Sequence, residues 1–206
     1  MCEQGFVGRS ERDVRLAAEQ HMRELGAQDP SFPTIVAAGP NGALPHHESS
    51  EREIRTGELV IVDMGAIVDG YCSDCTRTFA AGTRPDGEAA DVYEVVRAAQ
   101  AKALGAIHDG VGGREADGVS REPIVAAGHG DHYGHGLGHG VGIEVHEAPR
   151  LSPRSDDTIV AGDVVTVEPG VYVPGRLGVR IEDLVVVEPE GVRNLSGLPK
   201  ELRVVA

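Results

Sequence analysis

Residues 57–74, GELVIVDMGAIVDGYCSD, decide the fold of this chain. The segment is an apolar run that contains one acid, Asp63, and a second acid, Asp74, follows eleven residues later. A carboxylate among valines and isoleucines is costly to bury unless its charge is compensated. The stretch therefore predicts a buried strand whose acid has a positively charged partner.

A second copy of this segment lies 105 residues downstream, at residues 162–175, GDVVTVEPGVYVPG. In an ungapped alignment Asp63 falls on Glu168, and Asp74 has an acidic counterpart in Glu182, three residues out of register. The identical positions are Gly57, Val60, Val62, Gly65, Val68 and Gly70, which match Gly162, Val165, Val167, Gly170, Val173 and Gly175. The sequence thus predicts two related acidic hairpins and an internal pseudo-two-fold repeat.

The composition is that of a globular protein, and we expect one domain over residues 1–206. A net charge of −14 argues against a nucleic-acid surface. No apolar run approaches the ~20 residues of a membrane span, and the first residues lack a signal-peptide core. Three cysteines, an odd number, fit a reducing compartment better than a disulfide framework. We therefore expect a cytoplasmic protein that binds neither membranes nor nucleic acid.

Hydrophobic periodicity and turn residues predict an α+β chain with no linker inside it. Ser10 and Asp13 resemble a capping box at the start of the first helix. Pro123 lies inside the third helix, where it costs roughly 3 kcal/mol, so we expect a kink or a late start. The expected helices cover residues 10–25, 88–107 and 114–127, and the expected strands cover 32–38, 59–68, 75–80, 164–173 and 179–187, with a turn at 39–42 and a short last strand within 193–206.

Four carboxylates on two related hairpins need positive charge between them, and two divalent cations would supply it. The Gly- and His-rich segment 135–142, HGLGHGVG, offers a nitrogen ligand. Oxygen-rich sites with one imidazole suit Mn²⁺, Fe²⁺, Co²⁺ or Zn²⁺. Two metals about 3.5–4 Å apart, held by shared carboxylates, are a recurrent hydrolytic device. The pattern indicates a dinuclear hydrolase.

The motifs resemble those of the pita-bread metallopeptidases: Asp63-x10-Asp74, HGLGHGVGIEVHE at 135–147, TVEPG around Glu168 and GVRIED around Glu182. That family includes methionine aminopeptidases, Xaa-Pro aminopeptidases, prolidases and the non-metal creatinases, and the resemblance covers about residues 8–204. It implies two divalent metal ions, Mn²⁺ in first place, with Co²⁺, Fe²⁺ or Zn²⁺ as alternatives. The ligands that it implies are Asp63, Asp74, His139, Glu168 and Glu182, with Asp74 and Glu182 bridging.

Three features resemble the Xaa-Pro branch of this family. His135 lies four residues before His139, residues 144–149 read EVHEAP, and Arg180 lies two residues before Glu182. Methionine aminopeptidases usually lack the Arg and the first His, and creatinases lack the full ligand set. The resemblance therefore favours a Xaa-Pro aminopeptidase that acts on peptides with proline at position two.

For such an enzyme the resemblance implies hydrolysis of the first peptide bond by a hydroxide that bridges the two metals. Glu168 would be both ligand and proton shuttle. His46 and His146 would hydrogen-bond the substrate carbonyl and the developing oxyanion. His135 would line the proline pocket, and Arg180 would orient a ligand carboxylate.

Several alternatives stay open. Spacing to Asp63 favours His46 over His47 as the substrate-facing histidine, and His47, His129 and His132 are expected to be solvated neighbours. The C-x-x-C pair at 72–75 is expected to be two small strand residues. A prolidase, a methionine aminopeptidase and a non-catalytic peptide-binding homologue are the competing functions.

Relatives normally have a further helix before the position of Gly8, so the chain resembles an N-terminally truncated family member. A missing helix would expose apolar sheet surface, which predicts a site of aggregation or partner binding. The resemblance also implies that a homodimer is an option.

Overall fold

The computed structural model describes residues 5–206, in which helices pack on strands of four separate sheets. The α-helices are α1 (Glu11–Glu24), α2 (Gly87–Leu104) and α3 (Gly113–Ala126), and two short 3₁₀ helices are η2 (Gly39–Ala43) and η3 (Gly130–His132). None of the described helices is long and apolar enough to cross a membrane.

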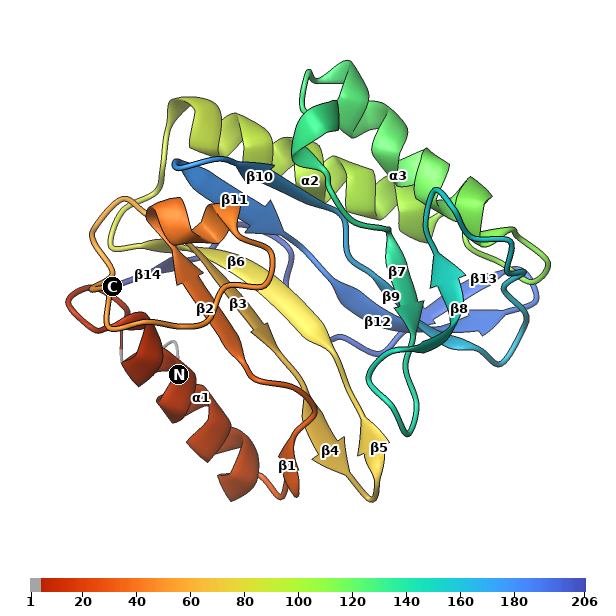
Figure 1. Cartoon of the computed structure of the whole chain (residues 1–206), viewed down its shortest axis with the longest axis horizontal. Coiled ribbons are helices and arrows are strands. Elements are labelled where there is room, and N and C mark those ends of the chain that lie inside the picture. Colours follow the sequence, from red (N-terminus) through yellow and green to blue (C-terminus); the bar gives the residue numbers. More distant parts are fainter. Residues whose placement is uncertain (1–4) are drawn as a thin grey trace.

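Two larger sheets lie side by side and form the body of the molecule (Figure 1). The four-stranded sheet has the order β14-β6-β3-β2, formed by Val204–Val205, Cys75–Ala81, Leu59–Met64 and Ile35–Ala38. The five-stranded sheet has the order β13-β12-β9-β7-β8, formed by Gly191–Asn194, Asp183–Glu188, Val164–Val167, Gly138–Gly140 and Glu147–Leu151. The two smaller sheets contain β1 (Asp29–Pro30), β4 (Ala66–Val68) and β5 (Tyr71–Cys72), and β10 (Gly170–Val173) and β11 (Leu177–Arg180).

The predicted repeat is present, but its long strands are broken. The expected strand 59–68 divides at Gly65 into β3 and β4, and the expected strand 164–173 divides at residues 168–169 into β9 and β10. Gly65 is needed at the first break because a Cβ there would lie 1.9 Å from the carbonyl oxygen of Ser73. Continuous strands were therefore a wrong prediction: in each half the chain leaves a larger sheet, forms a hairpin and returns.

This arrangement explains the register difference between the two acidic pairs. In the first half β3 pairs antiparallel with β6, and the β4–β5 hairpin lies between them; in the second half β9 pairs with β12, and the β10–β11 hairpin lies between them. Asp74 directly precedes β6, and Glu182 directly precedes β12. The second hairpin is longer than the first, so Glu182 lies three residues late in sequence but at the equivalent place in the fold.

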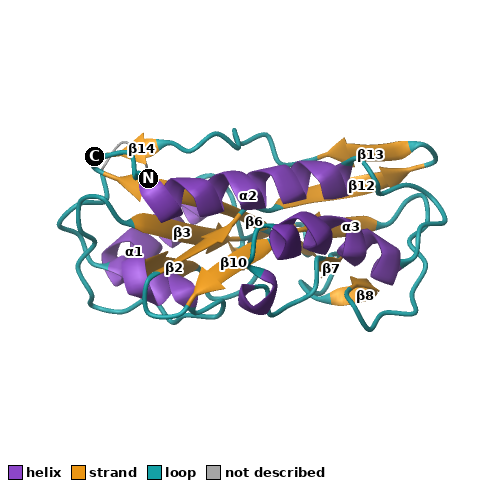
Figure 2. Cartoon of the chain, turned by 90° about the horizontal axis from the view of Figure 1, so that it is seen from above, coloured by secondary structure: helices purple, strands orange, loops and turns teal. Residues whose placement is uncertain are grey.

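The helices cover the sheets with aliphatic faces. Ser10 accepts a hydrogen bond from the Asp13 amide at 3.0 Å, which confirms the capping box, and α1 buries Val14 in a cluster with residues of β2 and β3. Figure 2 shows α2 and α3 lying over the strands. Helix α2 buries Val92 and Val96 against the β10–β11 hairpin, in a cluster that consists mainly of Val, Leu, Ala and Ile.

Some boundaries differ from expectation. The strand predicted over 32–38 begins only at Ile35, after Pro33, which has no N–H to donate. The predicted turn at 39–42 is the 3₁₀ helix η2. Helix α3 begins at Gly113 and includes Pro123, so the predicted late start is wrong; Pro123 lies near its C-terminal end, where one backbone hydrogen bond is lost. The short last strand, β14, is confirmed and pairs in parallel with β6.

Candidate metal centre

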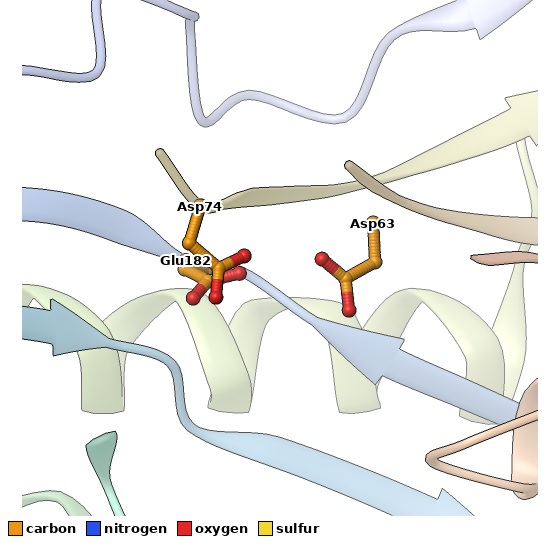
Figure 3. Close-up of side chains that lie close together, drawn as sticks. All are labelled: Asp63, Asp74 and Glu182. Atoms are coloured by element: carbon orange, nitrogen blue, oxygen red, sulfur yellow. The ribbon is translucent and has the colours of Figure 1, made fainter. Parts of the chain in front are cut away.

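Three buried carboxylates from both halves of the repeat converge at the centre of the molecule. Asp63 comes from the end of β3, Asp74 from just before β6 and Glu182 from just before β12. One oxygen of each lies within 4.8 Å of the others, and the side chains point toward one another in Figure 3. The residues are only 8%, 6% and 1% exposed, respectively. Such a cluster of like charges is unstable without positive charge between its members.

Asp63 and Glu182 each have one oxygen that accepts a hydrogen bond from a protein side chain and one oxygen without a partner in residues 5–206. Arg180 Nη2 donates to Asp63 Oδ2 at 2.5 Å, and Thr76 Oγ1 donates to Glu182 Oε2 at 2.6 Å. The other oxygens, Asp63 Oδ1 and Glu182 Oε1, are buried and have no hydrogen-bond partner among the described residues. Buried polar atoms normally have a hydrogen-bond partner. Two buried oxygens without one, in the same cluster, are therefore suited to bind a cation.

His139 and Glu168 extend the cluster. The Nε2 atom of His139 lies 3.2 Å from Glu168 Oε1 and 3.7 Å from Asp74 Oδ2. The Nδ1 atom of His139 is 3.0 Å from the carbonyl oxygen of Gly140, so in the neutral ring Nδ1 carries the proton and donates it there. The Nε2 lone pair then faces the carboxylates, which is the orientation of a histidine that binds a metal.

The pKa values of the clustered carboxyl groups show that their negative charges are not fully compensated by the protein. Burial, and then the charges of Asp63 and Glu168, raise the pKa of Asp74 to about 9. Burial, and then the charges of Asp74 and Glu168, raise the pKa of Glu182 well above its usual range. Burial also opposes the ionisation of Glu168, but a hydrogen bond from the protonated form of His139, together with the charges of His135, His139 and Arg180, outweighs it and holds the pKa at about 2. The residues therefore fit divalent cations, which would let all the carboxylates ionise together.

A chain of hydrogen bonds leads from this cluster to His135. Arg180 Nη1 donates to the hydroxyl of Tyr172 at 2.7 Å, and that hydroxyl lies 2.8 Å from His135 Nε2. The Nδ1 atom of His135 is 2.7 Å from the carbonyl oxygen of Gly136. Both nitrogens of His135 thus have protein partners, so its ring presents carbon atoms to its surroundings. Sequence reasoning missed Tyr172, whose only signal is a hydroxyl in an otherwise apolar strand.

All nine predicted site residues line one cavity of about 1090 Å³. The rings of His146 and His139 are 4.4 Å apart, and His46 enters from the loop after η2. The nine residues are His46, Asp63, Asp74, His135, His139, His146, Glu168, Arg180 and Glu182.

The neighbouring histidines differ from expectation at one position. His47 is not a solvated neighbour, because its Nε2 lies 2.8 Å from Oε2 of the buried Glu11 and its side chain is 11% exposed. His129 and His132 lie half-buried beside each other, with their Nδ1 atoms 3.2 Å apart. Cys72 ends β5 and Cys75 begins β6, both as free thiols, so the prediction of two strand residues is confirmed.

Comparison with known proteins defines the class. Residues 2–189 match the profile of metallopeptidase family M24, and the chain therefore belongs to this family. It is 48% identical over 195 residues to the uncharacterised peptidase YqhT of Bacillus subtilis (strain 168), over 95% of this chain and 55% of that protein. It is 42% identical over 195 residues to the Xaa-Pro dipeptidase of Pyrococcus furiosus, over 95% of this chain and 56% of that protein.

A solved structure gives the same result. The X-Pro aminopeptidase from Thermotoga maritima MSB8 superposes with a TM-score of 0.96 at 40% identity, over 99% of this chain and 58% of that chain. The chain thus spans somewhat more than half the length of the relatives that it matches. The predicted α+β pita-bread fold is confirmed, and the chain is a member of a metallopeptidase family.

Proposed function

We propose that this chain is the catalytic part of a Xaa-Pro aminopeptidase, which hydrolyses the bond between the first residue of a peptide and a proline at position two. One observation carries the proposal: a buried carboxylate cluster, with two oxygens that have no hydrogen-bond partner in the described part of the chain, lies beside His139 in a cavity that four further histidines line. Family membership and the names of the relatives support the same reaction class.

The metal ligands in this proposal are Asp63, Asp74, His139, Glu168 and Glu182, with Asp74 and Glu182 shared between two ions. When bound, two divalent cations lower the pKa of a water molecule and polarise the substrate carbonyl. Mn²⁺ is the proposed ion, and Co²⁺, Fe²⁺ and Zn²⁺ suit the same oxygen and imidazole donors.

Glu168 is the proposed proton carrier. Its carboxylate lies in the cavity with the proposed metal ligands, 3.2 Å from His139 Nε2, where it can accept a proton from the attacking water. The leaving atom is the proline nitrogen, which has no hydrogen in the peptide and must gain one to depart as an amine. A carboxylate beside the reacting carbonyl can carry the proton from the water to this nitrogen.

His146 and His46 are the proposed donors to the substrate carbonyl. Burial, and then the charge of His139, lower the pKa of His146, so its ring is neutral at pH 7 and offers one N–H. A donor placed where the carbonyl oxygen gains negative charge stabilises the transition state more than the ground state. His46 lines the same cavity and is the proposed second donor.

His135 is the proposed wall of the proline pocket. Both of its nitrogens are occupied by Tyr172 and Gly136, so it offers no hydrogen bond to a substrate. The apolar ring of proline has no N–H to satisfy, and it therefore suits such a wall. Burial lowers the pKa of His135 and keeps its ring uncharged.

A Xaa-Pro dipeptidase is the second candidate, because the similar protein of Pyrococcus furiosus carries that name. The X-Pro aminopeptidase from Thermotoga maritima, with its TM-score of 0.96, supports the aminopeptidase as the first candidate.

The test is a comparison of three peptide classes on the protein freed of metal and reloaded with Mn²⁺ or Co²⁺. Xaa-Pro-Yaa peptides are expected to give the highest kcat/KM, and the metal-free protein is the control. Preference for Xaa-Pro dipeptides would establish the dipeptidase instead. Cleavage of Met-Ala-Yaa peptides alone, or no cleavage with metal bound, would refute both and leave a methionine aminopeptidase or a binding protein.

A further inference from the structure

Glu11 is a buried carboxylate that the proposed reaction does not use. It lies in the first turn of α1, and its exposed fraction is 0%. Every partner of its two oxygens can donate a hydrogen bond. These partners are Ala38 N at 2.9 Å, Asn41 Nδ2 at 3.0 and 3.2 Å, His47 Nε2 at 2.8 Å, Ser50 N at 3.1 Å and Ser50 Oγ at 2.7 Å.

These contacts join three parts of the chain to α1. Ala38 ends β2, Asn41 belongs to η2, and His47 and Ser50 belong to the following loop. The loop has few regular backbone bonds of its own, and one of them runs from the His47 amide to the carbonyl of Leu44 at 3.1 Å. The loop is also held by the Arg12 amide of α1, which donates to the Ser50 carbonyl at 3.0 Å, and by the Val36 amide of β2, which donates to Ser49 Oγ at 2.8 Å. Glu11 adds the bonds that hold the ring of His47 and the amide and hydroxyl of Ser50.

His46 lies between two anchored neighbours in this loop. On one side, Arg180 Nη1 donates to the carbonyl oxygen of Pro45 at 3.3 Å, and the same guanidinium holds Asp63. On the other side, the ring of His47 is held by Glu11. The side chain of His46 itself lines the cavity of the carboxylate cluster. The anchors on both sides restrict where the His46 ring can lie.

A charged carboxylate is required at position 11. Burial opposes the ionisation of Glu11, but the hydrogen bonds from Ala38, Ser50 and the other donors outweigh it and hold the pKa below its usual value. A glutamine of the same shape has only one acceptor oxygen, and its NH₂ group would face donors. Glu11→Gln therefore removes the charge and one hydrogen-bond acceptor with almost no change in side-chain volume.

We propose that Glu11 is a positioning residue for His46: it fixes His47 and the loop 44–50 so that the neighbouring imidazole faces the substrate cavity. This inference rests on the proposed function, because it takes His46 as a group that contacts the substrate. Glu11 bonds to none of the proposed metal ligands, so its loss leaves metal binding intact.

The kinetic test is a double-mutant cycle on the metal-loaded chain with Xaa-Pro-Yaa peptides. Glu11→Gln is expected to lower kcat by roughly 10- to 100-fold, as a misplaced catalytic group does, while the metal content stays that of the wild type. In a His46→Ala background the same change is expected to have less than about a twofold further effect. An equal loss of kcat in both backgrounds, or no loss in the wild type, would overturn the proposal.

Glu58→Gln is the matched control. Glu58 is another partly buried carboxylate, which lies beyond the loop 44–50 and directly before β3, and it accepts from Arg52 Nη1 at 2.9 Å and from the Arg55 amide at 3.0 Å without contacting His47. A drop in kcat as large as that of Glu11→Gln would mean that any loss of a loop carboxylate has this effect, and it would refute a specific role of Glu11.

A second readout does not depend on activity. Amide hydrogen exchange of His47 and Ser50 is expected to speed up in Glu11→Gln and to stay unchanged in Glu58→Gln. This result would support the positioning role even if no Xaa-Pro peptide is cleaved and the proposed function fails; unchanged protection would contradict it. If Glu11→Gln does not fold, His47→Asn can replace it, because this variant removes only the contact between His47 and Glu11. His47→Asn is expected to lower kcat in the wild-type background and to have no further effect in the His46→Ala background. An unaltered kcat would count against the proposal.

Discussion

The guanidinium of Arg180 donates from Nη2 to Asp63 Oδ2 at 2.5 Å, and this bond joins the second half of the repeat to the first. Arg180 lies at the end of β11, and Asp63 lies near the end of β3. The same guanidinium also donates to Thr76 at 3.2 Å and to Tyr172 at 2.7 Å. One planar cation thus sets the position of a carboxylate and of the groups around it.

Replacing Arg180 with Lys keeps a charge but removes the fork that reaches several partners. We expect a loss of metal affinity by roughly 10- to 100-fold, as for other groups that orient ligands. Titration of the metal-free variant with Mn²⁺ measures this loss. Arg176→Lys is the control, because Arg176 is exposed and pairs with Glu88 at the surface. Wild-type affinity in Arg180→Lys would contradict the role assigned to the fork.

Tyr172→Phe removes the hydroxyl that connects Arg180 and His135. The buried Arg180 and the half-buried His135 then each lose a partner, and we expect the free energy of unfolding to fall by about 1–3 kcal/mol. His135 would also be less well fixed, so KM for Xaa-Pro-Yaa peptides should rise more than kcat falls. Chemical denaturation and steady-state kinetics measure the two effects. Unchanged stability would show that the hydroxyl is dispensable.

Gly65→Ala tests the break between β3 and β4. The added Cβ would lie 1.9 Å from the carbonyl oxygen of Ser73, next to Asp74, so backbone must move. We expect a loss of several degrees in Tm together with weaker metal binding. Gly118→Ala is the matched control, because it lies inside α3 with no atom near the new Cβ, and it should stabilise the helix by roughly 0.5–1 kcal/mol. Equal behaviour of the two variants would contradict this account.

The raised pKa of Asp74 gives the metal-free protein a defined dependence on pH. Burial, and then the charges of Asp63 and Glu168, move this pKa from 3.8 to about 9, so the folded state binds a proton that the unfolded state has released. Its contribution to stability is complete below about pH 4 and is lost as the pH rises toward about 9. Bound cations need the ionised carboxylate, so the stabilisation by Mn²⁺ should grow as the pH rises.

Thermal unfolding with and without Mn²⁺ at pH 5 and pH 8 checks this dependence. The difference in Tm between the two forms isolates the site from groups such as Glu11, whose lowered pKa acts in the opposite direction and in both forms. Asp74→Asn should reduce the growth of this difference with pH. A metal-induced rise in Tm that is the same at both pH values would refute the assignment.

The sequence singled out the proposed ligands because each is an acid or a histidine in an apolar, strand-like setting. The repeat related Asp63 to Glu168, and the structure brings both into one cavity together with the other predicted residues. Asp74 and Glu182 differ by three positions in sequence, and the longer second hairpin accounts for the difference.

The features that the sequence did not predict depend on contacts between segments that are far apart in the chain. Such contacts leave no periodic pattern in the sequence. The break at Gly65 follows from the approach of Ser73, and the role of Tyr172 follows from Arg180 and His135. Glu11 and His47 are far apart in sequence, so a capping-box position and a loop histidine gave no sign of their pairing.

The number of metal ions bound per chain shows whether the two acidic hairpins form a dinuclear centre. Metal-free protein is dialysed against Mn²⁺ and counted by elemental analysis, in parallel with His139→Ala and with Arg176→Lys as the surface control. We expect two ions per chain in the wild type and in Arg176→Lys, and at most one in His139→Ala. One ion or none in the wild type, or two retained in His139→Ala, would contradict this expectation.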